Sequence, residues 1–298
     1  MASPGEMSEG DRWIRWPAPA KLNLFLHIVG RRADGYHLLQ TAFQLLDWGD
    51  EVRVRVREDG AIRRLGPLPG VLDDADLGVR AAHALRAATG CRLGADIAID
   101  KRIPIGGGLG GGSSDAATVL VALNVLWNTG LDEDALAGIA LGLGADVPLF
   151  VRGRSAWAEG IGEELTPLAL PDRWFVVVDP RVAVPTRELF QVPELTRNSP
   201  RLTIPLFVSG VVTGNVFEPV ARARFPAVAA ALDWLGRRAE AKLSGSGGCV
   251  FARVASQESG AEIVAECPSG MQAWVARGVV ESPLRERLAD WRRERTRR

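Results

Sequence analysis

The spacing of apolar residues along the chain changes between a period of two and longer, helix-like patterns. Residues 21–28 place leucine or isoleucine at every even position, which predicts a strand with one buried face. Residues 51–57 alternate valine with charged residues, which predicts a half-exposed antiparallel strand. The alanine-rich residues 77–89 are followed by Gly90, so we expect a helix that ends there.

The rest of the pattern mixes strands and helices without a regular alternation. Residues 217–235 predict a helical segment that Pro226 breaks or kinks. This order favours an α/β fold of the α+β type over a doubly wound sheet. We expect further strands at 96–100, 174–179, 241–244, 249–254 and 272–279, and further helices at 114–127, 132–143, 186–190 and the C-terminus.

Composition and charge narrow the class of protein. The 298 residues predict about two domains, and 47% hydrophobic and 24% charged residues are typical of a globular protein. Lys+Arg and Asp+Glu both number 36, and this zero net charge argues against nucleic-acid binding. No apolar run reaches the ~20 residues of a membrane span. Residues 1–11 are polar and do not resemble a signal peptide. The chain has three cysteines without CxxC spacing, which predicts a reduced, cytoplasmic protein: Cys91, Cys249 and Cys267.

A glycine-rich segment carries the strongest chemical signal. Six of the seven residues at 106–112 are glycine, and the run lies between a predicted strand and a predicted helix. Free backbone N–H groups there can surround a phosphate, and the helix N-terminus adds partial positive charge. Ser113 and Ser114 can cap the helix or bind a phosphate oxygen. A flexible linker is the alternative, but a linker seldom joins a strand directly to a helix. Neither a Walker A loop nor a dinucleotide fingerprint matches.

Four other features are weaker when taken alone. Only three of the 36 basic residues are lysines: Lys21, Lys101 and Lys242. Each lysine is either a residual surface residue or lies where a compact charge with a tunable pKa is needed. Lys21 shares a strand face with Asn23, although a solvated lysine at a strand start is the commoner case. Residues 245–248 (GSGG) predict either a hairpin turn or a second ligand loop. Asp146, two residues before a proline, reads as a turn residue.

Taken together and in this order, these segments resemble the GHMP kinase superfamily. The matching motifs are PAPAKLNLFL at 17–26, PIGGGLGGGSSDAA at 104–117 and KLSGSGGCVFA at 242–252. GRRADGYHLLQT at 30–41 and LGADVPLFVRGRSAWAEGIGE at 143–163 are similar to one branch of it. That branch phosphorylates a cytidine diphosphate-linked methylerythritol in isoprenoid biosynthesis. The resemblance extends from about Arg15 to Leu288.

The resemblance implies a two-domain GHMP kinase fold with the active site in the cleft between the domains. Residues 1–162 would form the ATP-binding domain, and residues 163–298 a C-terminal domain that contributes to the substrate site. The implied reaction moves the γ-phosphoryl group of ATP, with Mg²⁺, to the 2-hydroxyl of the erythritol unit. The expected partner is this small molecule, with no nucleic acid and no membrane, and the protein would be a monomer or a homodimer.

The resemblance also assigns roles to individual residues. Lys21 and Asp146 would be the catalytic pair. Tyr36 is the only tyrosine of the chain, and together with His37 and Phe190 it would stack against cytosine. The ATP site would comprise Lys101, Pro104, Ile105, Gly106, Gly107, Gly108, Leu109, Gly110, Gly111, Gly112, Ser113 and Ser114. The substrate site would comprise Asn23, Tyr36, His37, Thr186 and Phe190.

Two points are open within the resemblance. The family usually has Asn-Leu at the adenine side, where this chain has Asp76-Leu77, and a carboxylate cannot donate as an amide does. No carboxylate ligand for Mg²⁺ is evident, so ATP oxygens and water would supply most of its shell, with Ser113 or Ser114 as one hydroxyl ligand.

Three alternatives remain for the function. A mevalonate- or homoserine-type kinase is disfavoured by Tyr36, His37 and Phe190, because those substrates carry no base to stack. A non-catalytic nucleotide-binding protein is disfavoured because Lys21 and Asp146 are both present. An RNA-binding module is disfavoured by the zero net charge and the few aromatic residues.

Overall fold

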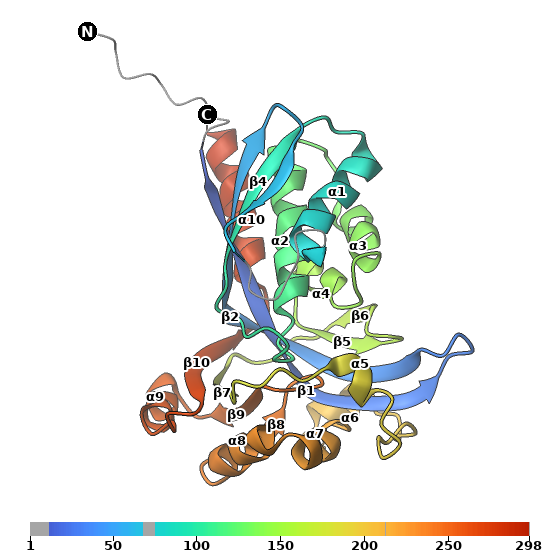
Figure 1. Ribbon diagram of the computed structural model, residues 1–298, viewed down its shortest axis with the longest axis vertical. Helices are drawn as coiled ribbons and strands as arrows, with labels where there is room; N and C mark the ends of the chain where they lie inside the picture. Colours follow the sequence, from blue (N-terminus) through green and yellow to red (C-terminus); the bar gives the residue numbers. More distant parts are fainter. Residues whose placement is uncertain (1–11, 68–74, 212, 298) are drawn as a thin grey trace.

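Two long antiparallel strands run through the molecule and connect its parts (Figure 1). The computed structural model describes residues 12–67, 75–211 and 213–297, so the N-terminal segment 1–11 lies outside the described residues. β1 (Ile14–Arg31) pairs with β2 (His37–Arg57), and the register shifts at three places along the pair. The predicted strands at 21–28 and 51–57 are confirmed as parts of β1 and β2.

Within the described residues, ten strands form one sheet around β2. The order is β3-β4-β2-β10-β7-β9-β8, while β1 and β5 also pair with β2, and β6 pairs with β5. Only β3 and β4 pair in parallel, so the α+β type of architecture is confirmed. The bounds are β3 (Ile62–Leu65), β4 (Gly94–Asp100), β5 (Ala156–Glu159), β6 (Glu164–Pro167), β7 (Arg173–Asp179), β8 (Ala241–Leu243), β9 (Val250–Val254) and β10 (Gln272–Val279).

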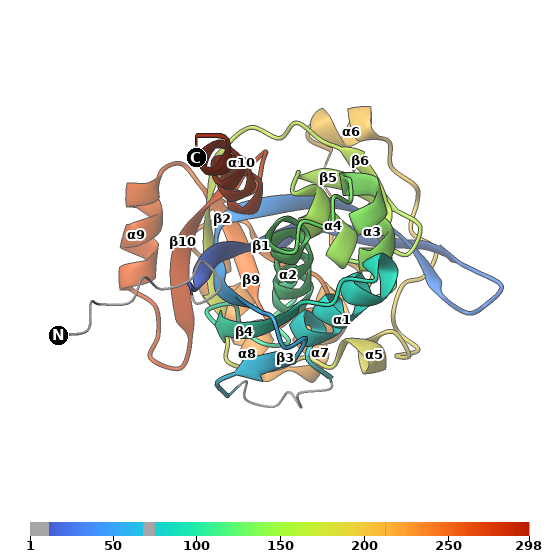
Figure 2. The same cartoon turned by 90° about the horizontal axis from the view of Figure 1, so that it is seen from above.

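The first hydrophobic core lies between β1, β2 and β4 and a layer of helices (Figure 2). α2 is central, because every residue from Ser114 to Asn124 is buried. α1 has the predicted limits: Asp76 caps its first turn, and Gly90 ends it in the left-handed conformation with φ 67°. The helices of this part are α1 (Leu77–Thr89), α2 (Gly111–Leu126), α3 (Glu133–Leu141), α4 (Val147–Arg152) and α10 (Pro283–Thr296).

The second core lies on β7, β8 and β9 and on the far half of β1. β1 therefore serves both cores: Trp16 and Ala18 belong to the first, and Leu26 and Ile28 to the second. The predicted break at Pro226 is confirmed, since one helix ends and the next begins there. The helices of this part are α5 (Thr186–Leu189), α6 (Ile204–Val208), α7 (Glu218–Arg224), α8 (Pro226–Gly236) and α9 (Gln257–Ala265).

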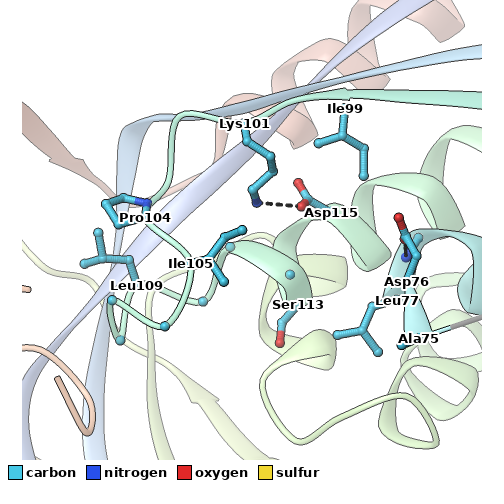
Figure 3. A pocket seen from close by; sticks show the side chains of 17 residues that line it. Ala75, Asp76, Leu77, Ile99, Lys101, Pro104, Ile105, Leu109, Ser113 and Asp115 are labelled. Atoms are coloured by element: carbon cyan, nitrogen blue, oxygen red, sulfur yellow. Dashed lines mark hydrogen bonds and ion pairs between the residues drawn. The ribbon is translucent and has the colours of Figure 1, made fainter. Parts of the chain in front are cut away.

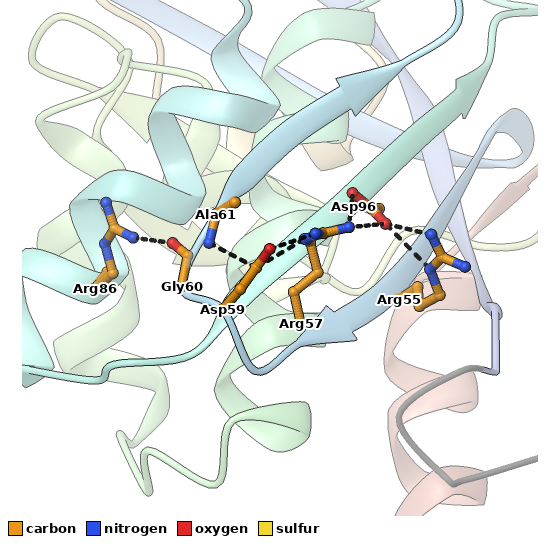
Figure 4. A network of polar contacts seen from close by, with 7 residues as sticks. All are labelled: Arg55, Arg57, Asp59, Gly60, Ala61, Arg86 and Asp96. Atoms are coloured by element: carbon orange, nitrogen blue, oxygen red, sulfur yellow. Dashed lines mark hydrogen bonds and ion pairs between the residues drawn. The ribbon is translucent and has the colours of Figure 1, made fainter.

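A buried carboxylate fixes β4 against β2 at the outer end of the first core (Figure 4). Asp96 is 1% exposed and accepts hydrogen bonds from Arg55 Nη2 at 2.6 Å and Arg57 Nη1 at 3.1 Å. Both arginines belong to β2 and Asp96 belongs to β4, so these hydrogen bonds stabilise the pairing of the two strands. β4 ends immediately before Lys101, and this network thus anchors the strand that leads into the glycine-rich loop. No helix in the described ranges is long and apolar enough to span a membrane.

Candidate active site

The glycine-rich loop follows β4 and runs into α2, as the sequence predicts. Gly108 and Gly110 both have a left-handed backbone, with φ of 74° and 76°. A Cβ atom on Gly108 would lie 2.1 Å from the Ser244 carbonyl oxygen, and one on Gly110 would lie 2.8 Å from the Phe150 ring. Both the conformation and the close contacts therefore require glycine here.

The start of α2 differs from the prediction and is better suited to an anion. The helix begins at Gly111 rather than Ser114, and its N-cap is Gly110, which makes no side-chain capping bond. The prediction that Ser113 or Ser114 caps α2 is therefore wrong. The first N–H groups of a helix have no intrahelical partner, so without a capping side chain they can bind an anion. The Ser114 hydroxyl is fully buried and has no hydrogen-bond partner in the described structure.

The GSGG segment is a hairpin turn between the antiparallel strands β8 and β9, and it supports the glycine-rich loop from behind. The Ser244 hydroxyl donates to the Gly108 carbonyl at 3.0 Å. The N–H groups of Gly248 and Cys249 donate to the carbonyls of Gly106 and Gly107 at 3.2 and 3.0 Å. Two segments more than 130 residues apart are thus joined, and the loop is held by backbone contacts.

A cavity of about 320 Å³ opens over the loop (Figure 3). Leu77 and Ile99 give it apolar walls, while Lys101 and Asp76 add charge. Of the predicted ATP-binding residues, Ser114 alone does not line it. Those that line it are Lys101, Pro104, Ile105, Gly106, Gly107, Gly108, Leu109, Gly110, Gly111, Gly112 and Ser113.

Lys101 lies between two buried aspartates that the sequence did not single out. Its Nζ donates to Asp115 Oδ2 at 2.8 Å and also contacts Asp50 Oδ2, and each aspartate is 3% exposed. Burial alone would lower the pKa of Lys101, but the charges of Asp115 and Asp50 outweigh it and raise that pKa. Burial raises the pKa of Asp115 to about 7, and the nearby charge of Asp50 adds to this. The cluster joins β2, the start of the loop and α2.

Lys21 is buried at the other side of the loop. Its Nζ donates to the Gly108 carbonyl at 2.9 Å and to Asn23 Oδ1, and it lies 3.7 Å from Asp146 Oδ2. Burial lowers the pKa of Lys21, and the charge of Asp146 opposes this only in part. Asn23 is 4% exposed and also donates to Thr41 Oγ1 at 3.0 Å, so it positions the lysine. It lines neither the cavity over the loop nor the one beside Tyr36.

Asp146 ends a turn and occupies the N-cap position of α4, which agrees with its interpretation as a turn residue. Its side chain makes no capping bond and is 33% exposed. The carboxylate therefore faces Lys21 and remains accessible. A carboxylate that is held beside a buried ammonium group and still reaches solvent can accept a proton from a bound ligand.

A second cavity of about 1060 Å³ brings four of the predicted substrate residues together: Tyr36, His37, Thr186 and Phe190. The His37 and Phe190 rings are stacked, with centroids 5.1 Å apart and planes 24° apart. Tyr36 is 60% exposed, so its ring is available. The Thr186 hydroxyl lies 2.6 Å from that of Ser246.

The Lys21–Asp146 pair lines neither of the two cavities, but it adjoins both. Lys21 binds the carbonyl of Gly108, which lines the first cavity. Asp146 follows Ala145, which lines the second. A phosphoryl group held over the loop and a hydroxyl group entering from the second cavity would therefore meet at this pair.

Asp76, where the resemblance led us to expect an asparagine, caps α1. It is 2% exposed and accepts hydrogen bonds from the N–H groups of Gly78 and Val79 at 2.7 and 3.2 Å. One oxygen also lies 3.4 Å from Arg64 Nη1. Its carboxylate therefore caps α1 at the wall of the first cavity.

The donor set suits a cation held mainly by its ligand. The part of the chain that the structure describes contains no group of three or more His, Cys, Asp or Glu side chains that could hold a metal ion. Ser113 offers a hydroxyl at the cavity wall, and Mg²⁺ commonly takes phosphate oxygens and water with few protein ligands. Together with the N–H groups of the loop, these residues fit a magnesium-bound triphosphate.

Family comparisons place the chain among the GHMP kinases. Residues 76–154 match the GHMP kinases N terminal domain, and residues 197–273 match the GHMP kinases C terminal domain. The 4-diphosphocytidyl-2-C-methyl-D-erythritol kinase of Halorhodospira halophila is 57% identical over 281 residues, which cover 93% of this chain and 97% of the relative. The kinase of the same name from Xanthomonas axonopodis pv. citri is 58% identical over 273 residues, which cover 91% and 92%.

Solved structures agree with this placement. A crystal structure of 4-(cytidine 5'-diphospho)-2C-methyl-D-erythritol kinase superposes with a TM-score of 0.78 at 34% identity, covering 89% of this chain and all of that one. Homoserine kinase from Cytophaga hutchinsonii gives a TM-score of 0.63 at 19% identity, covering 94% and 98%. The second likeness shows the fold alone.

Proposed function

Because the chain belongs to the 4-diphosphocytidyl-2-C-methyl-D-erythritol kinase family, an ATP-dependent branch of the GHMP kinases, we propose that it phosphorylates the 2-hydroxyl of that cytidyl compound in isoprenoid biosynthesis. The single observation that carries the proposal for the site is the Lys21–Asp146 pair, with 3.7 Å between Nζ and Oδ2, which adjoins the lining of both cavities through Gly108 and Ala145. ATP would occupy the cavity over the glycine-rich loop. The acceptor would occupy the cavity with Tyr36 and His37.

Phosphoryl transfer depends on positioning and charge neutralisation more than on covalent chemistry. The N–H groups at the start of α2 would bind phosphate oxygens. When bound, Mg²⁺ supplies further positive charge to the phosphates. Leu77 and Ile99 provide the apolar walls that an adenine ring needs.

Asp146 is the proposed acceptor of the hydroxyl proton. Its carboxylate is accessible and makes no capping bond. The proton moves from the acceptor hydroxyl to the carboxylate while the oxygen attacks the γ-phosphorus atom, and ADP leaves. Lys21, fixed by Asn23 and Gly108, stabilises the negative charge that develops on the attacking oxygen.

An activity assay can distinguish the proposed acceptor from the acceptors of other GHMP kinases. We would measure ADP release with Mg-ATP and four conditions: the cytidyl compound, mevalonate, homoserine and no acceptor. Turnover with the cytidyl compound alone is expected. Turnover with mevalonate or homoserine alone would keep the kinase activity and overturn the proposed acceptor. Binding of ATP without turnover would favour a non-catalytic nucleotide-binding protein.

Four finer statements belong to the same proposal. Division of the chain between residues 162 and 163 into an ATP-binding and a C-terminal domain is supported by the family matches on either side, while α10 returns to the first core and β1 contributes to both cores. The requirement for Mg²⁺ is supported by the donor set and is tested by chelation. A monomeric or homodimeric state is tested by light scattering. A cytoplasmic location is supported by the cysteine usage alone.

A further inference from the structure

Arg197 makes an unusual set of contacts beside the second cavity, which it lines. Its guanidinium is partly buried, and none of the carboxylates in the described ranges lies within 4.0 Å of it. All its partners are neutral. Nη2 donates to the carbonyls of Phe190 and Val192 at 2.9 and 2.7 Å, Nη1 donates to those of Leu195 and Pro193 at 3.0 and 3.4 Å, and Nε donates to His37 Nε2 at 3.3 Å.

These bonds fix the segment that carries Phe190. Four carbonyls within residues 190–195 converge on one planar cation, so the segment is folded around the guanidinium. Arginine suits this role because its donors lie in one rigid plane. The same cation reaches His37, which comes from the start of β2. Arg197 thus holds both rings of the His37–Phe190 stack.

Arg197 also determines which nitrogen of His37 carries the proton. A guanidinium has donors and no acceptor, so Nε2 must accept and a neutral ring carries its proton on Nδ1. Nδ1 has no partner in the structure as described, and His37 lines the cavity. Burial, Arg197 and Arg31 lower the pKa of His37. The other charged or titratable groups around this cavity are Tyr36, Arg187 and Asp34. Asp34 forms an ion pair with Arg32.

We propose that Arg197 is a positioning residue for base recognition, which holds the His37–Phe190 stack and presents Nδ1–H of a neutral His37 as a fixed donor to an acceptor atom on the edge of the pyrimidine. This inference rests on the proposed function. It concerns the choice of tautomer and the geometry of the stack, and Arg197 itself does not touch the reacting atoms.

The variant Arg197→Met tests the proposal through the pH dependence of substrate binding. Without the guanidinium, a neutral His37 populates both tautomers, and the one protonated on Nε2 offers no donor at Nδ1. We expect the KM for the cytidyl compound at pH 8 to rise about tenfold. The kcat and the KM for ATP should stay within about twofold.

Lowering the pH distinguishes this role from a merely structural one. Burial and Arg31 still lower the pKa of His37 in the variant, but loss of the Arg197 charge should raise that pKa relative to the wild type, and an imidazolium donates from both nitrogens. The ratio of variant to wild-type KM should therefore fall toward one as the pH decreases from 8 to 6. A ratio that is constant with pH, or a kcat that falls together with binding, would overturn the proposal.

Two further variants and a control variant distinguish the proposed role from a general loss of structure. His37→Asn keeps an amide donor near the Nδ1 position and does not titrate, so in its background the effect of Arg197→Met should lose its pH dependence. Arg197→Gln keeps a neutral donor toward Nε2 and should rescue binding in part, which also covers a failure of the methionine variant to fold. Arg224→Met is the control, because Arg224 pairs at 3.6 Å with Glu194 on the exposed side of the same segment. It should leave KM unchanged.

The tautomer can be read without any activity. The chain has three histidines, so ¹⁵N NMR of the imidazoles, assigned with His37→Asn, should show His37 protonated on Nδ1 alone from pH 8 to 6. Protonation on Nε2 would overturn the proposal even in an active enzyme. If the expected tautomer is present but another acceptor is phosphorylated, the proposed substrate fails and the positioning by Arg197 stands.

Discussion

Lys21 is buried and Lys101 is half-buried beside aspartates at the same loop, and their surroundings shift their pKa values in opposite directions. The side chain of Lys21 is 4% exposed and has one carboxylate at 3.7 Å, so burial dominates and its pKa falls. That of Lys101 is 17% exposed and contacts two buried carboxylates, so its pKa rises despite burial. The deeper burial of Lys21 and the larger number of closer carboxylates around Lys101 together decide the sign.

The difference separates a group that can take part in chemistry from one that holds the structure. The partner of Lys21, Asp146, is 33% exposed and can exchange its contact for a bound hydroxyl. The partners of Lys101, Asp50 and Asp115, are closed off, and Asp50 also accepts the N–H group of Ile103 at 2.8 Å. We therefore expect loss of activity from changes at the first pair and loss of stability from changes at the second.

Asp146→Asn should give the largest effect. The amide keeps the size of the side chain but cannot take a proton, so kcat should fall about a thousandfold. The dissociation constant for ATP, measured by calorimetry, should change by less than about twofold, because Asp146 does not line the ATP cavity. Asp134→Asn on α3 is the matched control, since its side chain is 82% exposed, and it should leave kcat unchanged. Near-normal turnover of Asp146→Asn would exclude this carboxylate as the base.

Lys101→Met should have the next largest effect, on stability. It leaves two buried carboxylates without their cation, so the free energy of unfolding in urea should fall by about 3–5 kcal/mol. Adding Asp115→Asn to this variant should recover part of the loss. Lys242→Met is the control, because its partner Glu240 is 75% exposed and the pair lies at 3.2 Å. It should cost less than about 1 kcal/mol.

Lys21→Met completes that test. Asp146 can be hydrated when its partner is removed, whereas Asn23 Oδ1 and the Gly108 carbonyl lose a donor, so this variant should lose kcat while losing only about 1–2 kcal/mol of stability. If Lys21→Met destabilised the protein as much as Lys101→Met, the two lysines would not differ in the way proposed.

The sequence predicts those parts that local rules determine. The limits of α1 follow from its alanine-rich pattern and from Gly90, and the loop over the ATP cavity follows from its glycines. The N-terminal half of β1 was missed because Pro17 and Pro19 argue against a strand. They are tolerated because, among the described strands, this half of β1 pairs with β2 alone. α4 was also missed, because six residues carry no usable period.

The residues that the sequence did not reveal act through long-range contacts. Asp50 meets Lys101 from 51 positions away, and Arg197 meets His37 from 160 positions away. No periodicity or spacing signals such a pair, because its geometry exists only after the strands have paired. Asp115 lies inside the recognised motif, but the sequence does not show that it is buried. Its burial is what makes the ionised carboxylate unfavourable in the folded protein.

Asp115→Asn should give the smallest effect and the finest test of the Lys101 cluster. Because the pKa of Asp115 is raised to about 7 in the folded protein, the native state binds a proton that the unfolded chain has already lost at pH 5–7. This contribution to stability is complete below the unfolded pKa of ~3.9 and is lost as the pH rises through 7. Relative to Asp115→Asn, the wild type should therefore lose about 2 kcal/mol between pH 5 and pH 8 in urea unfolding. Histidines titrate in both proteins and cancel in the difference. Parallel curves would mean that Asp115 stays ionised throughout, so that Lys101 fully compensates both carboxylates.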